Sequence, residues 1–226
     1  MPALPPRPRH DPCLFSFDDG FASNVRAAQD ILAYHGVKAL FFVCPGLMEL
    51  EPDEQRREIA ARIFGGGVTA DALDLEMRLM TWDDVRQLRA TGHTVGAHGH
   101  THLPLTSLSG TMLEREVASP ARLLAERLGV KPHWFAFPFG TTAHVSAQAL
   151  AVVARHYRFC RSGVRGPNGA GVSRYALRAD AIDPQAPEAW RDLIIEGGLD
   201  FRYRGARRIL DRVAPGERQP VRDDLA

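Results

Sequence analysis

The sequence lacks the features that mark membrane, secreted or nucleic-acid-binding proteins. Its three cysteines, Cys13, Cys44 and Cys160, form no C-x-x-C pair and cannot all be bridged, which favours a reducing compartment. No apolar run approaches membrane-spanning length, and the proline- and arginine-rich residues 1–11 lack the apolar core of a signal peptide. The formal net charge is only +1, so neither nucleic acid nor an anionic membrane surface is indicated as a partner. We therefore expect a cytoplasmic protein without a membrane span.

The length and composition are those of one globular domain. The chain has 226 residues, of which 45% are hydrophobic and 24% are charged, and this is enough to bury a core. We find no internal repeat and expect a single domain over residues 1–226, with polar tails at 1–11 and 215–226. The sequence indicates no particular oligomeric state.

Apolar periodicity predicts strands that alternate with helices. The expected strands are 13–17, 37–44, 93–98, 134–140, 157–163 and 175–183, and the expected helices are 24–34, 81–92, 112–129 and 146–157. Residues 46–80 are less regular and are expected to form helices joined by a surface loop. Thr81 is the predicted N-cap of its helix, because acidic residues follow it in the first turn. Strands separated by helices of this length are typical of a parallel sheet, so we predict the α/β class.

Polar residues gather at three predicted strand ends, which is where parallel α/β sheets place their sites. Asp18 and Asp19 follow the first strand, HGHTH (98–102) ends the strand over 93–98, and Pro-Phe-Gly (138–140) ends the next one. Two imidazoles four residues apart, with a carboxylate, are typical of a divalent-metal site that keeps open positions. A neighbouring carboxylate can stay off the metal and act as a base. The alternatives are a polar Asp-Gly turn, and a histidine loop that has no function or binds metal adventitiously.

Three motifs together carry a family resemblance. SFDDG (16–20), VGAHGHTH (95–102) and FAFPFG (135–140), in this order and at these separations, resemble the polysaccharide deacetylase (NodB-homology) family, carbohydrate esterase family four. The flanking stretches ILAYHGVKALFFV and MTWDDVRQLRATGHTVGAH resemble segments of the same family, so that the resemblance covers roughly residues 12–200. It implies a distorted (β/α) barrel and a metal-dependent hydrolase.

The first two motifs imply a base and three metal ligands. By resemblance, Asp18 is the general base, and Asp19, His98 and His102 bind a divalent metal. The resemblance implies zinc in the first place, with cobalt, nickel or manganese as alternatives. One departure is Gly99, which stands where the family usually has Ser or Thr.

The third motif implies residues that face the substrate. By resemblance, the backbone N–H of Phe139 helps to hold the developing oxyanion, and Phe137, Pro138 and Gly140 bind the substrate. A preorganised donor of this kind typically contributes about 3 kcal/mol to lowering the barrier.

Two departures affect how the catalytic groups are supplied. The third motif usually begins with an arginine that orients the base, but Ala136 occupies that place. Arg178, in the predicted strand 175–183, is the candidate that could reach Asp18 instead; the alternative is a surface ion pair with a nearby aspartate.

The second departure concerns the general acid. The family's late Leu-x-His motif has no counterpart, because no histidine follows His156. His133, His144 and His156 remain as candidates. The alternatives are that metal-bound water supplies the proton, that Asp18 returns the proton it has taken, or that turnover is slow.

The function implied is hydrolysis of an N-acetyl group from an amino sugar, with release of acetate. The expected partner is an N-acetylated saccharide, such as a soluble precursor in surface-polysaccharide assembly. Two alternatives stay open. One is a C–N hydrolase of a non-sugar amide, and the other is a catalytically impaired relative that still binds carbohydrate.

Overall fold

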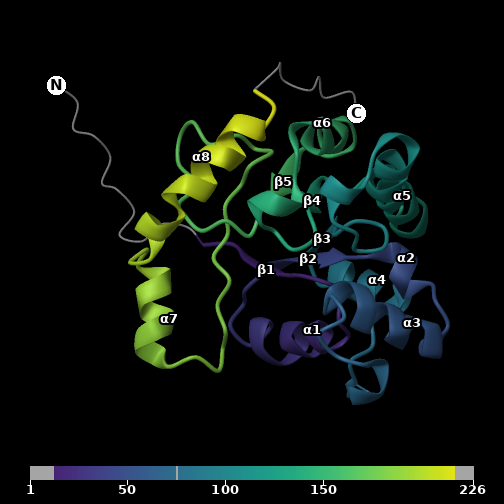
Figure 1. Cartoon of the computed structure of the whole chain (residues 1–226). Helices are drawn as coiled ribbons and strands as arrows, with labels where there is room; N and C mark the ends of the chain where they lie inside the picture. The colour runs from purple at the N-terminus through teal and green to yellow at the C-terminus, as the bar shows by residue number, and fades with distance from the viewer. Residues whose placement is uncertain (1–12, 75, 217–226) are drawn as a thin grey trace.

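The centre of the molecule is a parallel sheet of five strands in the order β1-β2-β3-β4-β5 (Figure 1). The computed structural model describes residues 13–74 and 76–216. The strands are β1 (Phe15–Phe17), β2 (Ala39–Val43), β3 (Thr94–Ala97), β4 (Trp134–Ala136) and β5 (Phe159–Arg161). Because neighbours in the chain are also neighbours in the sheet, every crossover runs the same way, and the sheet curls into a half-barrel. The predicted α/β class is confirmed.

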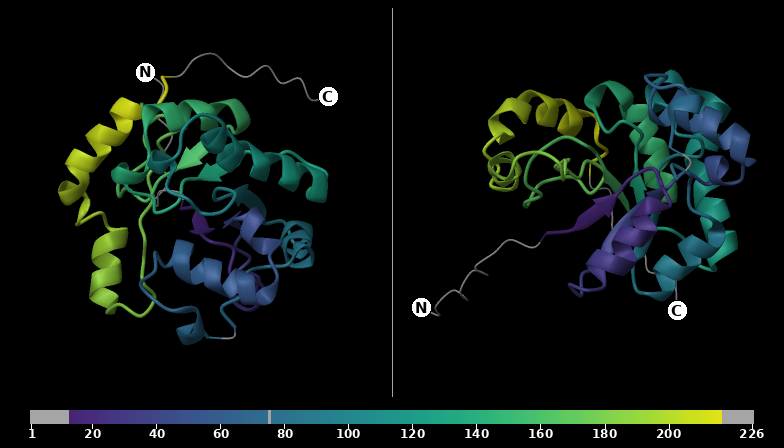
Figure 2. Two further views of the ribbon diagram at one scale, coloured as in Figure 1. Left: turned by 45° about the vertical axis from the view of Figure 1, so that its right-hand side comes forward. Right: turned by 90° about the horizontal axis from the view of Figure 1, so that it is seen from below.

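Helices connect the strands and extend beyond the last one. They are α1 (Ser23–Arg26), continued by a π-helix over Ala27–Leu32; α2 (Pro45–Met48); α3 (Pro52–Glu58), continued by a π-helix over Ile59–Ile63; α4 (Trp82–Ala90); α5 (Gly110–Leu128); α6 (Ala147–His156); α7 (Glu188–Ile195); and α8 (Arg204–Val213). Figures 1 and 2 show α2, α3 and α5 on one side of the molecule and α7 and α8 on the opposite side.

The two faces of the sheet bury different side chains, because successive strand residues point to opposite faces. Phe41, Val43 and Phe135 pack against the helices in the main hydrophobic core. The concave face carries a second, smaller cluster that includes Phe42 and Ala136. The strand ends, where the polar motifs follow, border the site.

Local sequence signals explain the start of α4. The Thr81 side chain accepts the backbone N–H of Asp84, and the Asp84 side chain accepts the backbone N–H of Thr81. This reciprocal pair satisfies donors that have no partner within the helix. The predicted N-cap is confirmed.

The predicted strand over 175–183 is wrong. Only one parallel bridge forms, between Arg161 and Leu177. Beyond it, the side chain of Asn168 accepts the backbone N–H of Arg178 at 2.8 Å and donates to its carbonyl at 2.9 Å. These backbone groups of Arg178 point away from β5. On the side that faces β5, the next bond runs from the Ala179 N–H to the Val164 carbonyl at 3.1 Å, which is out of register, so the ladder ends.

Two features bear on the expectations drawn from composition. All three cysteines are free thiols; Cys44 and Cys160 are buried, and burial raises the pKa of Cys160 to about 12. Over the part of the chain that the structure describes, no helix has both the length and the apolar character needed to cross a bilayer.

Candidate functional site

The predicted polar clusters lie at the carboxyl edge of the sheet. Asp18 and Asp19 follow β1, His98 follows β3, residues 138–140 follow β4, and Arg161 is the last residue of β5. Parallel strands end on the same edge, so residues far apart in the chain are brought together there.

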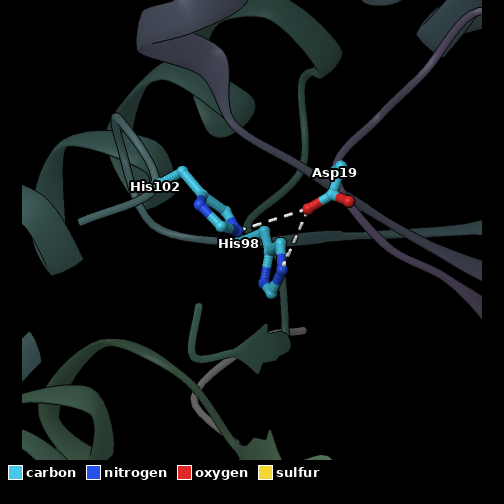
Figure 3. Close-up of side chains that lie close together, drawn as sticks. All are labelled: Asp19, His98 and His102. Atoms are coloured by element: carbon cyan, nitrogen blue, oxygen red, sulfur yellow. Dashed lines mark ion pairs between the residues drawn. The ribbon is translucent and has the colours of Figure 1, made fainter. Parts of the chain in front are cut away.

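Asp19, His98 and His102 form one cluster (Figure 3). The Asp19 Oδ1 atom lies 3.4 Å from His98 Nε2 and 3.3 Å from His102 Nε2. Their potential ligand atoms all lie within 4.8 Å of one another, and each histidine is 3% exposed. The structure thus brings together the three residues that the sequence suggested as metal ligands.

Backbone carbonyls orient both imidazole rings. His98 Nδ1 lies 2.8 Å from the carbonyl oxygen of Ala136, and His102 Nδ1 lies 3.1 Å from that of Arg62. A carbonyl oxygen only accepts, so each Nδ1 carries a proton. Nε2 is therefore the nitrogen that faces Asp19, and in the neutral ring it can bind a cation. Two such nitrogens and one carboxylate oxygen fit a divalent cation.

The charges of the cluster stabilise one another. Burial alone would raise the pKa of Asp19, but hydrogen bonds and charge from His102 and His98 outweigh it and hold that pKa well below its ordinary value. Burial would lower the pKa of His98, but Asp18 and Asp19 outweigh it and raise the pKa. Asp19 is therefore ionised and acts only as an acceptor.

The backbone is strained at three places in the site. Asp19, His102 and Phe139 have φ values of 68°, 60° and 64°, and within the described residues they are the only non-glycine positions with positive φ. Such conformations persist only where the surrounding structure holds them, and they gather at functional sites. All three belong to the motifs singled out in the sequence.

Asp18 points to a different partner from Asp19. Its Oδ1 atom accepts a hydrogen bond from Nη2 of Arg161, and the two side chains form an ion pair. The Asp18 side chain is 40% exposed, whereas that of Arg161 is 13% exposed. The neighbouring carboxylates are therefore separated by their partners: imidazoles for Asp19 and a guanidinium for Asp18.

The expected contact between Arg178 and Asp18 is wrong. The Arg178 guanidinium pairs with Asp211 of α8 at 2.9 Å, and its backbone is held by Asn168. The register of β5 brings Arg161 to the carboxyl edge instead. Sequence reasoning missed Arg161; the signal available was an arginine at the end of a predicted strand, the position where sites lie.

The third motif divides between the core and the site. Phe137 is 1% exposed and packs in the main core, so its side chain cannot contact a substrate and that expectation is wrong. Phe139 is 37% exposed, and its ring centroid lies 4.8 Å from that of His102. At Gly140, with φ +64°, a Cβ atom would lie 2.7 Å from the backbone nitrogen of Gly163. Glycine is required there by this close approach.

A buried glutamate supports the histidine loop. Glu116 of α5 is 4% exposed, and its Oε1 atom accepts the backbone N–H groups of Thr101 at 2.8 Å and Leu103 at 3.3 Å. Its Oε2 atom accepts the Thr101 hydroxyl at 3.0 Å. At Gly99, a Cβ atom would lie 2.7 Å from Glu116 Oε1, which explains glycine where the family usually has Ser or Thr. Sequence reasoning missed Glu116; the signal was an acid on the apolar face of a helix.

We expect Glu116→Ala to weaken metal binding by about 10- to 100-fold, the usual cost of losing a group that holds metal ligands in place. The substitution leaves the backbone donors of Thr101 and Leu103 without their acceptor and frees the loop that carries His98 and His102. Zinc titration by calorimetry measures the change. Glu114→Ala, a 41% exposed acid of the same helix that pairs with Arg155 and His156 of α6, is the control. Equal affinities in the two variants would contradict this role.

Comparison with known proteins identifies the family. A family model described as polysaccharide deacetylase matches residues 7–156, which is more than half of the 226-residue chain. The chain belongs to the polysaccharide deacetylase family. Membership supports a deacetylase that acts on N-acetyl groups. The match includes Asp18 and His102 but ends before Arg161, whereas the resemblance was expected to reach about residue 200. No match was found among curated protein sequences.

Solved structures of deacetylases share the fold of this family member. The Streptococcus pyogenes deacetylase PplD, in complex with acetate, is similar with a TM-score of 0.62 and 20% identity over 80% of this chain and 69% of that chain. IcaB from Ammonifex degensii is similar with a TM-score of 0.59 and 20% identity, over 80% of this chain and 71% of that chain. The BpsB deacetylase domain from Bordetella bronchiseptica is similar with a TM-score of 0.57 and 18% identity, over 78% of this chain and 72% of that chain. The expected distorted (β/α) barrel of the NodB type is confirmed.

Proposed function

We propose that this protein hydrolyses the N-acetyl group of an amino sugar to a free amine and acetate. Family membership supports a deacetylase. The observation that carries the proposal is the cluster of Asp19, His98 and His102, with a second carboxylate, Asp18, adjacent in the chain and turned to another partner. In a metal-assisted hydrolase, the first element can hold the cation and the second can take a proton from the attacking water.

In this proposal, Asp19, His98 and His102 hold a divalent cation, through one carboxylate oxygen and two Nε2 atoms. When bound, a zinc ion, or cobalt, nickel or manganese in its place, supplies a water of lowered pKa and polarises the amide carbonyl. The carbonyls of Ala136 and Arg62 keep Nε2 of both rings turned toward Asp19 and keep a proton on each Nδ1.

Asp18 is the proposed general base and takes a proton from the attacking water. The backbone N–H of Phe139 is the proposed donor to the developing oxyanion, an interaction that typically contributes about 3 kcal/mol. The strained backbone at Phe139 supports this role, because it presents the group in a conformation that the fold must hold in place.

The proton that the leaving nitrogen needs has few candidate donors. His133 precedes β4, at the opposite edge of the sheet from the site, and His156 pairs with Glu114. His144 follows β4, and its ring centroid lies 4.8 Å from that of Phe139. We assign the return of the proton to Asp18, which received it in the first step.

Acetate release tests the proposal. The purified protein is loaded separately with zinc, cobalt, nickel and manganese and incubated with N-acetylated nucleotide sugars, N-acetylhexosamine oligomers and a non-sugar amide. We expect acetate and a free amine from at least one sugar. Hydrolysis of the non-sugar amide alone would favour the other C–N hydrolase, and no hydrolysis with any metal would reject the enzyme. The cytoplasmic location stays a prediction.

A further inference from the structure

We propose that Arg161 is the positioning residue for Asp18, and that it supplies from β5 the cation that is missing at Ala136 of β4. This inference rests on the proposed function, because the role of Asp18 as a base belongs to that proposal. The experiment below is chosen so that the two can fail separately.

Sheet register places the two positions next to each other. In the parallel ladder between β4 and β5, Ala136 is the register partner of Arg161. Partners in register lie on the same face, and both residues end their strands at the carboxyl edge. An arginine at either position therefore starts from neighbouring points of the concave face and can extend toward the end of β1.

The Arg161 side chain is held in one direction. Its guanidinium carbon lies 4.9 Å from the centre of the Phe42 ring, and Nη1 donates to the carbonyl of Ser162 at 3.2 Å. Within the described part of the chain, Asp18 is the only carboxylate that forms an ion pair with Arg161. A planar guanidinium fixed by stacking loses little freedom when it forms its hydrogen bond, so Nη2 is preorganised toward Asp18.

The segment after β5 holds the backbone on both sides of Arg161. Leu177 donates its backbone N–H to the Cys160 carbonyl at 3.0 Å, and its own carbonyl accepts the Ser162 N–H at 2.7 Å. The Ser162 hydroxyl donates to that carbonyl as well, at 2.9 Å. These bonds flank Arg161 in the chain and hold its backbone where β5 ends.

The ion pair gives adjacent carboxylates separate tasks. Asp18 and Asp19 carry like charges, and without other partners both would be attracted to the same cation. The guanidinium of Arg161 holds the Asp18 carboxylate, while the imidazoles hold Asp19. Arg161 therefore keeps Asp18 out of the cluster and free to accept a proton.

The test compares Arg161→Ala, Arg161→Lys and the double variant Arg161→Ala/Ala136→Arg with the wild type. We expect Arg161→Ala to lower kcat by about 100-fold, the cost of roughly 1 Å of misplacement, with KM and metal content unchanged. Lysine should restore part of the loss. The kcat of the double variant should be at least about tenfold higher than that of Arg161→Ala, because the new guanidinium extends from the neighbouring position.

Arg165→Ala is the matched control. The Arg165 side chain is also 13% exposed, pairs with Asp180 at 3.5 Å, and lies 5.8 Å from the centre of the Tyr203 ring. It should keep the wild-type kcat. A loss in Arg161→Ala no larger than in this control would overturn the inference, as would a drop in metal content and melting temperature that tracks the loss of kcat.

Crystal structures of the wild type, Arg161→Ala and the double variant provide a readout that does not depend on turnover. The Asp18 carboxylate should turn away from its wild-type position in the single variant and return in the double variant. An unmoved carboxylate would overturn the inference. If Arg161→Ala does not fold, the uncharged Arg161→Gln takes its place in both measurements. If the wild type releases no acetate from any substrate, the proposed function fails, and the carboxylate positions still decide the inference.

Discussion

Asp18→Asn is expected to lower kcat for acetate release by about 10²- to 10⁴-fold, the usual contribution of a general base, while the metal stays bound. Asparagine keeps the shape of the side chain but cannot take a proton at neutral pH. Asp18 also stands outside the cluster and pairs with Arg161, so the substitution removes none of the three proposed ligand atoms. Steady-state kinetics and metal analysis of the same preparation measure both quantities.

Asp211→Asn is the control for this substitution. The Asp211 side chain is 45% exposed and pairs with Arg178, a setting close to that of Asp18 with Arg161. The control should retain the wild-type rate. If Asp18→Asn instead lost as much metal as the ligand variants, the tasks of Asp18 and Asp19 would have to be exchanged.

The second large effect is expected from His102→Ala, which should lose the metal first and the activity as a consequence. The substitution removes one of the three proposed ligand atoms. The metal affinity should therefore fall by more than the roughly 10- to 100-fold lost when a group that only hydrogen-bonds to a ligand is removed. Zinc at 100 times its dissociation constant stabilises a folded protein by about 2.7 kcal/mol, and this stabilisation should be lost in the variant. Thermal unfolding with and without zinc measures it.

Backbone strain could also weaken this variant, so a second substitution is needed. His102 has φ 60°, a conformation that asparagine tolerates better than alanine. His102→Asn should therefore lose zinc stabilisation as fully as His102→Ala, with a more stable metal-free form. His100→Ala tests the same loop at a histidine outside the cluster and should still bind zinc. Loss of zinc in His100→Ala but not in His102→Asn would show that the ligand has been misassigned.

The elements that the sequence predicted correctly depend on local patterns. Apolar runs such as the one in β2 bury both faces of a strand, and Thr81 with Asp84 satisfies the first turn of α4 within four residues of chain. The convergence of Asp19, His98 and His102 could be anticipated for a related reason. Parallel strands end on one edge, so polar residues at strand ends meet there whatever the details of packing.

The predictions that failed concern features that are set by contacts with residues distant in the chain. The stretch 175–183 has the composition of a strand, but it leaves the register of β5 after Leu177, because the Ala179 N–H bonds the Val164 carbonyl. Composition cannot reveal this change of partner, because the partner lies in another segment of the chain. Phe137 was assigned to the substrate for a similar reason: the motif gives its place in the chain, and only the pleat decides which face it covers.

The sequence by itself determined the α/β class, the family, and the set of carboxylate and imidazole groups at the strand ends. Tertiary structure alone decided which cation meets Asp18 and what holds the histidine loop. Arg161 lies 143 positions from Asp18 in the chain, and its reach depends on the register between β4 and β5. Glu116 acts from a helix across the loop. Such contacts depend on how elements pack, and packing is set by many residues at once, so no short motif records it.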